Sequence, residues 1–411
     1  TVIRIGLDAR TLERREEIRG IGVLVAALVE RLPAADADFV LFFRRHPDCP
    51  PPHSARSMVL RIRPDRPRWI ARVLWEQVVL PRALHQEGLD LYHAPANRGV
   101  PRAAPVPCVV TINDVIPLVT PYLFDSRPDP RWTRPLLRRA YAALVGAGVR
   151  RAARIITLSE CSRRDLERLF PLARGKVRVI YPGCDERYRP VEDPQELARV
   201  RARWALPPRF VVYVGGLGQR KNLAGLLRAY AELVGAAPAT PPLIVVGAAT
   251  AFLPRLQAQA QQLGIAERVR FPGYIPTAEM PAVLSAAELL VYPSFYEGFG
   301  LPVLEAMACG CPVVCSGTSS LPEVGGDAVV YVDPADPGDI AGAMGRVLAD
   351  GALRAWMREA GLQRARLFPL RRMVEETLAV YREVVGDRRV RAVSAPVPQG
   401  SPGSAAPTTR S

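Results

Sequence analysis

The sequence of 411 residues is poor in lysine, in paired cysteines and in long apolar runs. Its only lysines are Lys176 and Lys221, so the formal charge of +15 comes almost entirely from arginine. The seven cysteines form no CxxC pair and are odd in number, which leaves no readable zinc site or disulfide framework and favours a reducing compartment. No apolar run reaches the roughly 18–20 residues of a transmembrane helix. The strand-like start leaves no room for a signal peptide.

The remaining composition is that of a globular protein. Hydrophobic residues make up 49% of the chain and charged residues 23%, which excludes a wholly disordered protein, and the length indicates two domains. The positive charge leaves three classes of partner open: nucleic acid, an anionic membrane surface and a phosphorylated ligand. A solvated arginine-rich surface is the simpler interpretation. We expect a cytoplasmic protein that contacts a membrane at most peripherally.

Strand and helix patterns alternate along most of the chain, in a first series over 2–180 and a second over 210–368. Such alternation predicts parallel sheets with helices on both faces, which here means two Rossmann-like α/β domains. The proline-rich, charged segment 187–209 marks the boundary, and the last segment lacks an apolar period, which is typical of disorder. The predicted parts are an N-terminal domain at 1–186, a C-terminal domain at 187–368, a helix at 369–386 and a disordered tail at 387–411.

The strongest motif is YEGFGLPVLE, residues 296–305. A strand pattern ends just before it, and Pro302 stands where a helix would begin. A glycine-rich turn exposes backbone N–H groups and a helix N-terminus adds partial positive charge, so the segment suits a phosphate. Glu297 in the loop and Glu305 in the helix can face one crevice and accept hydrogen bonds from sugar or ribose hydroxyls. Two solvated glutamates are the plainer interpretation.

A second motif, YVGGLGQRKNL at 213–223, also leads from a strand through glycines into a helix. Arg220 and Lys221 at the helix entry suit a diphosphate that departs as an anion. The GxxxxGK[ST] spacing of a P-loop and the GxGxxG pattern of a dinucleotide site are both absent, which disfavours a nicotinamide cofactor. Cations at a helix start are unfavourable without an anion, so the pattern indicates a ligand.

With four further segments, these loops resemble the retaining GT-B glycosyltransferases of family 4, the bacterial mannosyltransferase-like enzymes. The segments are RGIG at 19–22, NDVIP at 113–117, IYPG at 180–183 and SSLPEV at 319–324, and the two glutamates keep the family's spacing. The resemblance runs from Arg19 to about Val385. It implies two domains facing a cleft and a last helix that crosses back to the N-terminal domain.

The resemblance also implies residue roles. Arg220 and Lys221 would stabilise the pyrophosphate as a leaving group, Glu297 would hold the donor sugar and Glu305 the ribose. Asn113 and Asp114 complete the expected catalytic set. The further substrate-binding residues would be Gly20, Gly22, Gly216, Gly298, Phe299, Gly300, Leu301, Glu323 and Val324. No metal and no cofactor are expected beside the nucleotide diphosphate sugar, which is a co-substrate.

One position departs from the family, which commonly has His-Asp where this chain has Asn113-Asp114. Asparagine can hydrogen-bond a hydroxyl but cannot take up a proton near neutral pH. His93, which ends the preceding strand, can point into the same cleft, although a structural histidine is the simpler interpretation. Either leaving-group stabilisation with substrate-assisted proton transfer suffices, or activity is weakened. A sugar-nucleotide-binding protein without turnover stays open as an alternative, as does a GT-B epimerase.

The expected reaction moves a hexosyl residue, mannose from GDP-mannose first, to a hydroxyl of a glycan or lipid-linked acceptor. Nucleic acid is not expected as a partner, because it explains the charge but not the glutamate pair. Trp69 and Trp75, among arginines 61, 63, 66, 68 and 72, either pack inside the N-terminal domain or touch anionic lipid. The aromatics of 121–132, Tyr122, Phe124 and Trp132, either stack on an acceptor sugar or anchor their loop.

Overall fold

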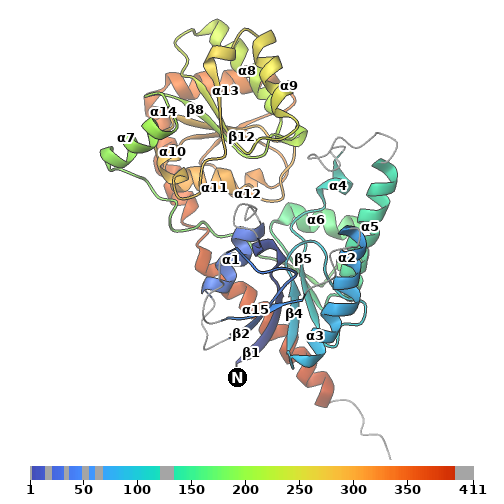
Figure 1. The fold of residues 1–411 in the computed structure, drawn as a ribbon. Helices are drawn as coiled ribbons and strands as arrows, with labels where there is room; N and C mark the ends of the chain where they lie inside the picture. Colours follow the sequence, from blue (N-terminus) through green and yellow to red (C-terminus); the bar gives the residue numbers. More distant parts are fainter. Residues whose placement is uncertain are drawn as a thin grey trace, which may run out of the picture.

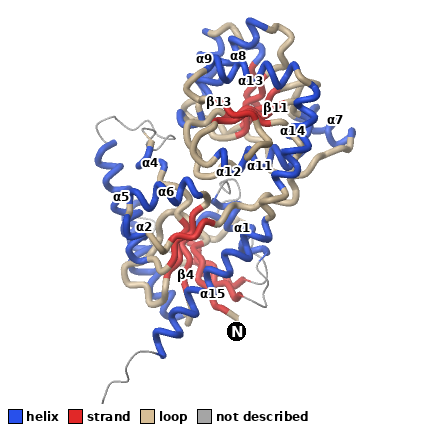
Figure 2. Tube along the Cα trace, turned by 180° about the vertical axis from the view of Figure 1, so that it is seen from behind, coloured by secondary structure: helices blue, strands red, loops and turns tan. Residues whose placement is uncertain are grey.

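The computed structural model describes residues 2–13, 21–31, 37–48, 55–60, 68–120 and 134–393. These form two lobes, each built around a parallel sheet with helices on both faces (Figures 1 and 2). The predicted fold class, two Rossmann-like α/β domains facing a central cleft, is confirmed.

The N-terminal lobe holds a seven-stranded sheet of order β3-β2-β1-β4-β5-β6-β7. Its central strands are apolar on both faces, as parallel strands covered by helices are, and Leu7 of β1 lies between Leu41 of β2 and His93 of β4. The edge strand β3 escaped prediction because it is only partly buried and carries polar residues. The strands are β1 (Ile3–Asp8), β2 (Ala37–Phe43), β3 (Ala55–Val59), β4 (Leu91–Ala94), β5 (Cys108–Thr111), β6 (Arg154–Thr157) and β7 (Val177–Val179).

In the N-terminal lobe, two short helices, α2 (Arg68–Leu74) and α3 (Leu80–Gln86), are joined by a π-turn. The turn at Trp75–Val79 buries Trp75, whose indole N–H donates to the Leu60 carbonyl. The packing interpretation is therefore correct for Trp75. The N-terminal helices are α1 (Ile21–Arg31), α2 (Arg68–Leu74), α3 (Leu80–Gln86), α4 (Ile116–Val119), α5 (Arg134–Arg151) and α6 (Glu160–Leu169), with short 3-10 turns at Arg10–Leu12 and Pro171–Ala173.

The C-terminal lobe holds a six-stranded sheet of order β10-β9-β8-β11-β12-β13, and one continuous hydrophobic core surrounds it. The strands are β8 (Val211–Val214), β9 (Leu243–Val246), β10 (Val269–Gly273), β11 (Leu289–Tyr292), β12 (Val313–Ser316) and β13 (Val330–Val332). The helices are α7 (Pro194–Arg203), α8 (Leu223–Ala236), α9 (Leu253–Gln262), α10 (Met280–Ala286), α11 (Leu301–Ala308), α12 (Leu321–Gly325), α13 (Pro337–Ala349) and α14 (Gly351–Ala365), with 3-10 turns at Gln219–Lys221 and Ala266–Arg268.

Two helices lie at the predicted boundaries. α7 lies inside the proline-rich, charged segment 187–209 that was predicted to mark the domain boundary: the Asp193 side chain caps its start, Pro194 follows, and Val200 is buried. The last helix, α15 (Leu370–Val393), runs along the N-terminal lobe and buries Tyr381 in the core cluster that contains β1 (Figure 1). It extends seven residues into the segment 387–411 that was predicted to be disordered, and 394–411 lie outside the described residues.

Candidate active site

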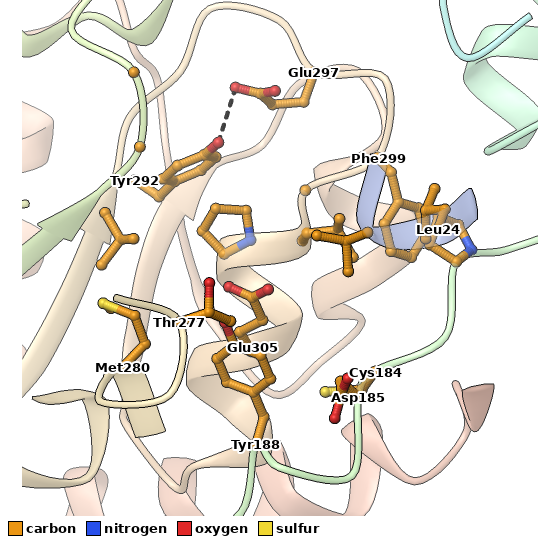
Figure 3. A pocket seen from close by; sticks show the side chains of 18 of the residues that line it. Leu24, Cys184, Asp185, Tyr188, Thr277, Met280, Tyr292, Glu297, Phe299 and Glu305 are labelled. Carbon is orange, nitrogen blue, oxygen red and sulfur yellow. Dashed lines mark hydrogen bonds between the residues drawn. The ribbon is translucent and has the colours of Figure 1, made fainter. Parts of the chain in front are cut away.

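A cavity of about 510 Å³ lies between the two lobes, a size typical of small-molecule sites. From the N-terminal lobe, helix α1 contributes Val23, Leu24 and Ala27, and the loop after β5 contributes Asn113 and Asp114. Most of the remaining wall belongs to the C-terminal lobe, at the carboxyl ends of its strands (Figure 3). Ligands of open parallel sheets bind at that edge.

Glu297 is the centre of an ionic cluster on the C-terminal wall. Its Oε1 accepts hydrogen bonds from Lys221 Nζ at 2.7 Å and from the Tyr292 hydroxyl at 3.1 Å (Figure 3), and its Oε2 pairs with Arg220 at 2.9 Å. Burial alone would raise the pKa of Glu297, but the two cations outweigh burial and lower that pKa to about 2. One carboxylate and two cations leave an excess of one positive charge in the cluster.

The two cations occupy different places. Lys221 lines the cavity, whereas Arg220 does not, because its guanidinium binds Glu297 and the Tyr296 carbonyl behind the wall. Asn222, in the left-handed conformation at φ 56°, ends the 3-10 turn that carries both cations and starts α8. Lys221 thus faces the cavity directly and Arg220 contacts its wall through Glu297, and the binding of a pyrophosphate by both residues stays a prediction.

The glycine-rich loop is shaped by two close approaches. A Cβ on Gly298 would lie 3.1 Å from the Asn113 carbonyl oxygen of the opposite lobe. Gly300 has a φ of 124°, and a Cβ there would lie 2.6 Å from Leu321 Cδ2. The loop then enters α11, whose first residues line the cavity together with Phe299. Pro302 has no N–H, and the Val303 and Leu304 N–H groups donate to the Gly300 carbonyl. The start of α11 therefore favours an anion through the positive end of its helix dipole.

Glu305, on α11, also lines the cavity, so the two motif glutamates do face one crevice (Figure 3). Burial raises the pKa of Glu305 to about 7, with a contribution from the nearby Asp185, while the Tyr188 hydroxyl opposes the rise. The carboxyl group of Glu305 therefore holds its proton to a higher pH than a solvated glutamate does. A ligand that offers hydroxyl hydrogens would favour its ionised form.

On the N-terminal wall, Asn113 and Asp114 follow β5 at the carboxyl edge of the sheet. The Asn113 backbone N–H donates to Asn97 Oδ1 at 2.7 Å, and Asp114 Oδ1 accepts from the Ile116 N–H at 3.1 Å. Burial raises the pKa of Asp114. Both residues line the cavity and lie beside Gly298 of the opposite lobe.

His93 is a structural residue, as the simpler interpretation held. Its two ring nitrogens lie 2.7 Å from the Tyr381 hydroxyl and 2.8 Å from Thr111 Oγ1. Burial lowers the pKa of His93 to about 3, so the ring is neutral. It does not line the main cavity.

Three expected ligand residues are not part of the cavity wall, and a fourth lies outside the described residues. Glu323 does not line the cavity, because its carboxylate accepts from the Glu160 and Cys161 N–H groups at the start of α6, at 2.7 Å each. Val324 is fully buried in the C-terminal core. Gly22 belongs to the first turn of α1 and not to a loop, and it is not part of the cavity wall. Gly20 falls outside the described residues.

Several residues that line the cavity were not predicted from the sequence, chiefly Tyr188, Asp185, Tyr292, Thr277 and Met280. Tyr292 ends β11 at the ligand-binding edge of the sheet, a position that alone could have pointed to it. Asp185 and Tyr188 follow the YPG turn at 181–183, where the N-terminal domain was predicted to end. Gly216 does line the cavity, with open space beside its Cα.

Two expectations about aromatic residues concern side chains that the structure does not describe. The Trp69 side chain and the loop 121–132, with Tyr122, Phe124 and Trp132, are outside the described residues. Within the ranges that are described, no helix is both long and apolar enough to cross a bilayer. The same ranges hold no group of three or more acidic, cysteine or histidine side chains placed to bind a metal ion.

Two family models match the two lobes. Residues 18–188 match the model described as Glycosyltransferase Family 4, and residues 195–364 match that of the Glycosyl transferases group 1. The chain is 36% identical to O-antigen chain mannosyltransferase B of Escherichia coli over 230 residues, 56% of this chain and 60% of the relative. It is also 36% identical to a D-inositol 3-phosphate glycosyltransferase of Corynebacterium jeikeium over 231 residues, 54% of this chain and 55% of that relative. The matches thus span less than two thirds of these relatives' length.

Solved structures share the whole fold. Sucrose-phosphate synthase from Thermosynechococcus elongatus superposes with a TM-score of 0.71 at 24% identity, over 95% of this chain and 100% of that one. Anabaena HepE in complex with UDP-glucose superposes with a TM-score of 0.70 at 20% identity, over 92% of this chain and 100% of that one. With both lobes matched and the cleft in place, the chain belongs to family 4 of the GT-B glycosyltransferases.

Proposed function

We propose that the protein is a retaining hexosyltransferase that takes its sugar from a nucleoside diphosphate donor held mainly by the C-terminal lobe. The observation that carries the proposal is the Lys221–Glu297–Arg220 cluster beside the start of α11, on one wall of a cavity between the lobes. A cation and a helix N-terminus at one place suit a pyrophosphate.

In the reaction, the bond between the anomeric carbon and the β-phosphate oxygen breaks, and the electron pair stays with the phosphate. Lys221 and the positive end of the α11 helix dipole stabilise this developing charge. The acceptor hydroxyl oxygen bonds to the anomeric carbon on the same face, and its proton passes to the departing phosphate oxygen. This route needs no imidazole base, which agrees with Asn113 at the N-terminal wall and with the neutral, enclosed His93.

On the C-terminal wall, Glu305 would hold the ribose hydroxyls and Glu297 a hydroxyl of the transferred sugar. The first donor to test is GDP-mannose, in keeping with the Escherichia coli mannosyltransferase among the relatives. UDP- and dTDP-sugars follow, since HepE is a structural neighbour that binds UDP-glucose. The acceptor would be a hydroxyl of a glycan or of a lipid-linked glycan, reached in the cytoplasm or at the inner face of the membrane.

A thermal-shift screen over nucleotide sugars tests the proposal. A donor at 100 times its Kd stabilises the protein by about 2.7 kcal/mol, which is readily measured as a rise in Tm. The expected result is a clear rise with one nucleotide class, followed by release of the nucleoside diphosphate when acceptors are added. A rise in Tm without turnover on any acceptor would support a binding protein of the same fold, and no rise with any donor would contradict both.

A further inference from the structure

Asn97 lies outside every motif of the sequence, and its side chain makes four hydrogen bonds around the N-terminal wall. It follows β4 and has a φ of 56°, in the left-handed region that asparagine and glycine tolerate best. Its Oδ1 accepts from the Asn113 backbone N–H at 2.7 Å and from Asn113 Nδ2 at 3.1 Å. Its Nδ2 donates to the Asp114 carbonyl at 3.1 Å and to the Tyr141 hydroxyl at 3.0 Å.

The backbone determines which way both amides point. The Asn113 N–H only donates and the Asp114 carbonyl only accepts, so Asn97 must turn Oδ1 toward the first and Nδ2 toward the second. The Asn113 amide then faces Asn97 Oδ1 and the Pro95 carbonyl, which are both acceptors. Asn113 must therefore present Nδ2 to them.

With Nδ2 of Asn113 turned toward these acceptors, its side-chain oxygen, Oδ1, points away from them. Asn113 is 4% exposed, and its Oδ1 has no hydrogen-bond partner among the described residues. Asn113 lines the main cavity and also a smaller one of about 50 Å³ beneath α1. A buried acceptor without a hydrogen-bond donor costs free energy, so the site is incomplete as it stands.

We infer that Asn97 is a positioning residue, which fixes Asn113 as a pure hydrogen-bond acceptor for one hydroxyl of the donor sugar. The inference rests on the proposed function, because it assigns the missing hydrogen-bond donor to the bound sugar. It narrows the sugar class to neutral hexoses with a hydroxyl at that place. A deoxy sugar leaves Oδ1 unpaired, and a uronate brings a carboxylate against it.

The test measures calorimetric affinities of the full chain for two pairs of probes, GDP with GDP-mannose and UDP with UDP-glucose. The variants are Asn113→Ala, Asn97→Gly and the double variant. Glycine keeps the left-handed conformation of position 97, so Asn97→Gly removes the amide without adding backbone strain. Each single variant should bind the nucleotide sugar about tenfold more weakly and the nucleoside diphosphate within about twofold of wild type.

The double variant separates positioning from a general structural role. If Asn97 acts through Asn113, Asn97→Gly changes the affinity for the nucleotide sugar less than about twofold once Asn113 is alanine. Additive losses, or equal losses for nucleotide sugar and nucleoside diphosphate, would overturn the inference and leave the proposed function standing. A wild-type chain that binds none of the four probes would instead remove the proposed function, and the inference with it.

A measurement on the wild type alone guards against a variant that does not fold. Monodeoxy and monofluoro analogues of whichever nucleotide sugar binds are titrated in turn. Fluorine accepts but does not donate, so the hydroxyl that meets Asn113 should be the one whose loss costs about tenfold for both the deoxy and the fluoro analogue. A series in which no hydroxyl shows this pairing would overturn the inference.

Discussion

The two walls of the cavity are built in different ways. The C-terminal wall concentrates charge, with Glu297 paired to Lys221 and Arg220, while α1 gives the N-terminal wall Val23, Leu24 and Ala27. The N-terminal wall carries Asp114 and, beside it, the amide network of Asn97 and Asn113, in which no side chain changes charge. On the proposed function, the C-terminal lobe binds the anionic part of the donor, and the N-terminal lobe adds a neutral acceptor for one sugar hydroxyl.

The largest expected effect comes from removing the cation of the C-terminal wall. Lys221→Ala should raise the barrier to transfer by about 2–4 kcal/mol, because the leaving pyrophosphate loses its charged partner. Turnover of the donor under saturating conditions measures this. The other lysine is a matched control: Lys176 binds the carbonyls of Val149, Arg150 and Ala152, so Lys176→Ala should lower Tm slightly and leave turnover unchanged. Equal turnover in Lys221→Ala and Lys176→Ala would contradict the role of the C-terminal wall in binding the pyrophosphate.

A second prediction concerns the glycine-rich loop of the C-terminal wall, whose Gly298 lies against Asn113 of the N-terminal wall. Gly300→Ala adds a Cβ 2.6 Å from Leu321 Cδ2 at a φ of 124°, so it should lower the free energy of unfolding by about 1–3 kcal/mol and weaken nucleotide binding. Urea unfolding and calorimetry measure the two effects. The control is Gly235→Ala, on an exposed turn of α8 with nothing within 4 Å, which should be neutral or stabilising. A Gly300→Ala variant as stable as Gly235→Ala would show that the loop tolerates another shape.

The pH dependence of stability should reveal Glu305. Its pKa is raised from 4.5 to about 7, so the folded state holds a proton that the unfolded state has released between these values. Stability from this group is complete below about pH 4.5 and is lost as pH rises toward 7. Urea midpoints at intervals from pH 4.5 to 8 should fall less steeply in Glu305→Gln than in wild type. Identical slopes would place Glu305 in a more solvated setting than the cavity wall.

The smallest effect is expected at the contact between the lobes. Glu323→Gln removes the negative charge at the start of α6, which should weaken two hydrogen bonds by about 0.3–1 kcal/mol in all. Hydrogen exchange of the Glu160 and Cys161 amides should speed up accordingly. Glu359→Gln, on the exposed face of α14, is the control and should leave these amides unchanged. Unchanged exchange in both variants would mean that Glu323 does not hold the lobes together.

The residues of the site that could be predicted from the sequence are those that each lie within a contiguous motif. Glu297, Lys221 and Glu305 were predictable because strand, glycine turn and helix entry follow one another in a contiguous segment, and the chemistry of such a turn is local. Asn97, Tyr188 and the place of Glu323 depend on how distant segments meet. The SSLPEV segment predicts that Glu323 lines the pocket, but its carboxylate accepts hydrogen bonds from the start of α6 in the opposite lobe. The α15 contact with β1 and β4 is equally non-local.

The most direct test of the central claim compares nucleoside diphosphates with monophosphates by calorimetry on wild type and Lys221→Ala. If the C-terminal wall binds the pyrophosphate, wild type should prefer GDP over GMP, or UDP over UMP, by more than about tenfold, a difference of about 1.4 kcal/mol. Lys221→Ala should lose most of that preference while its affinity for the monophosphate stays within about twofold. Equal affinity of wild type for diphosphate and monophosphate, or a preference that survives in Lys221→Ala, would contradict the account.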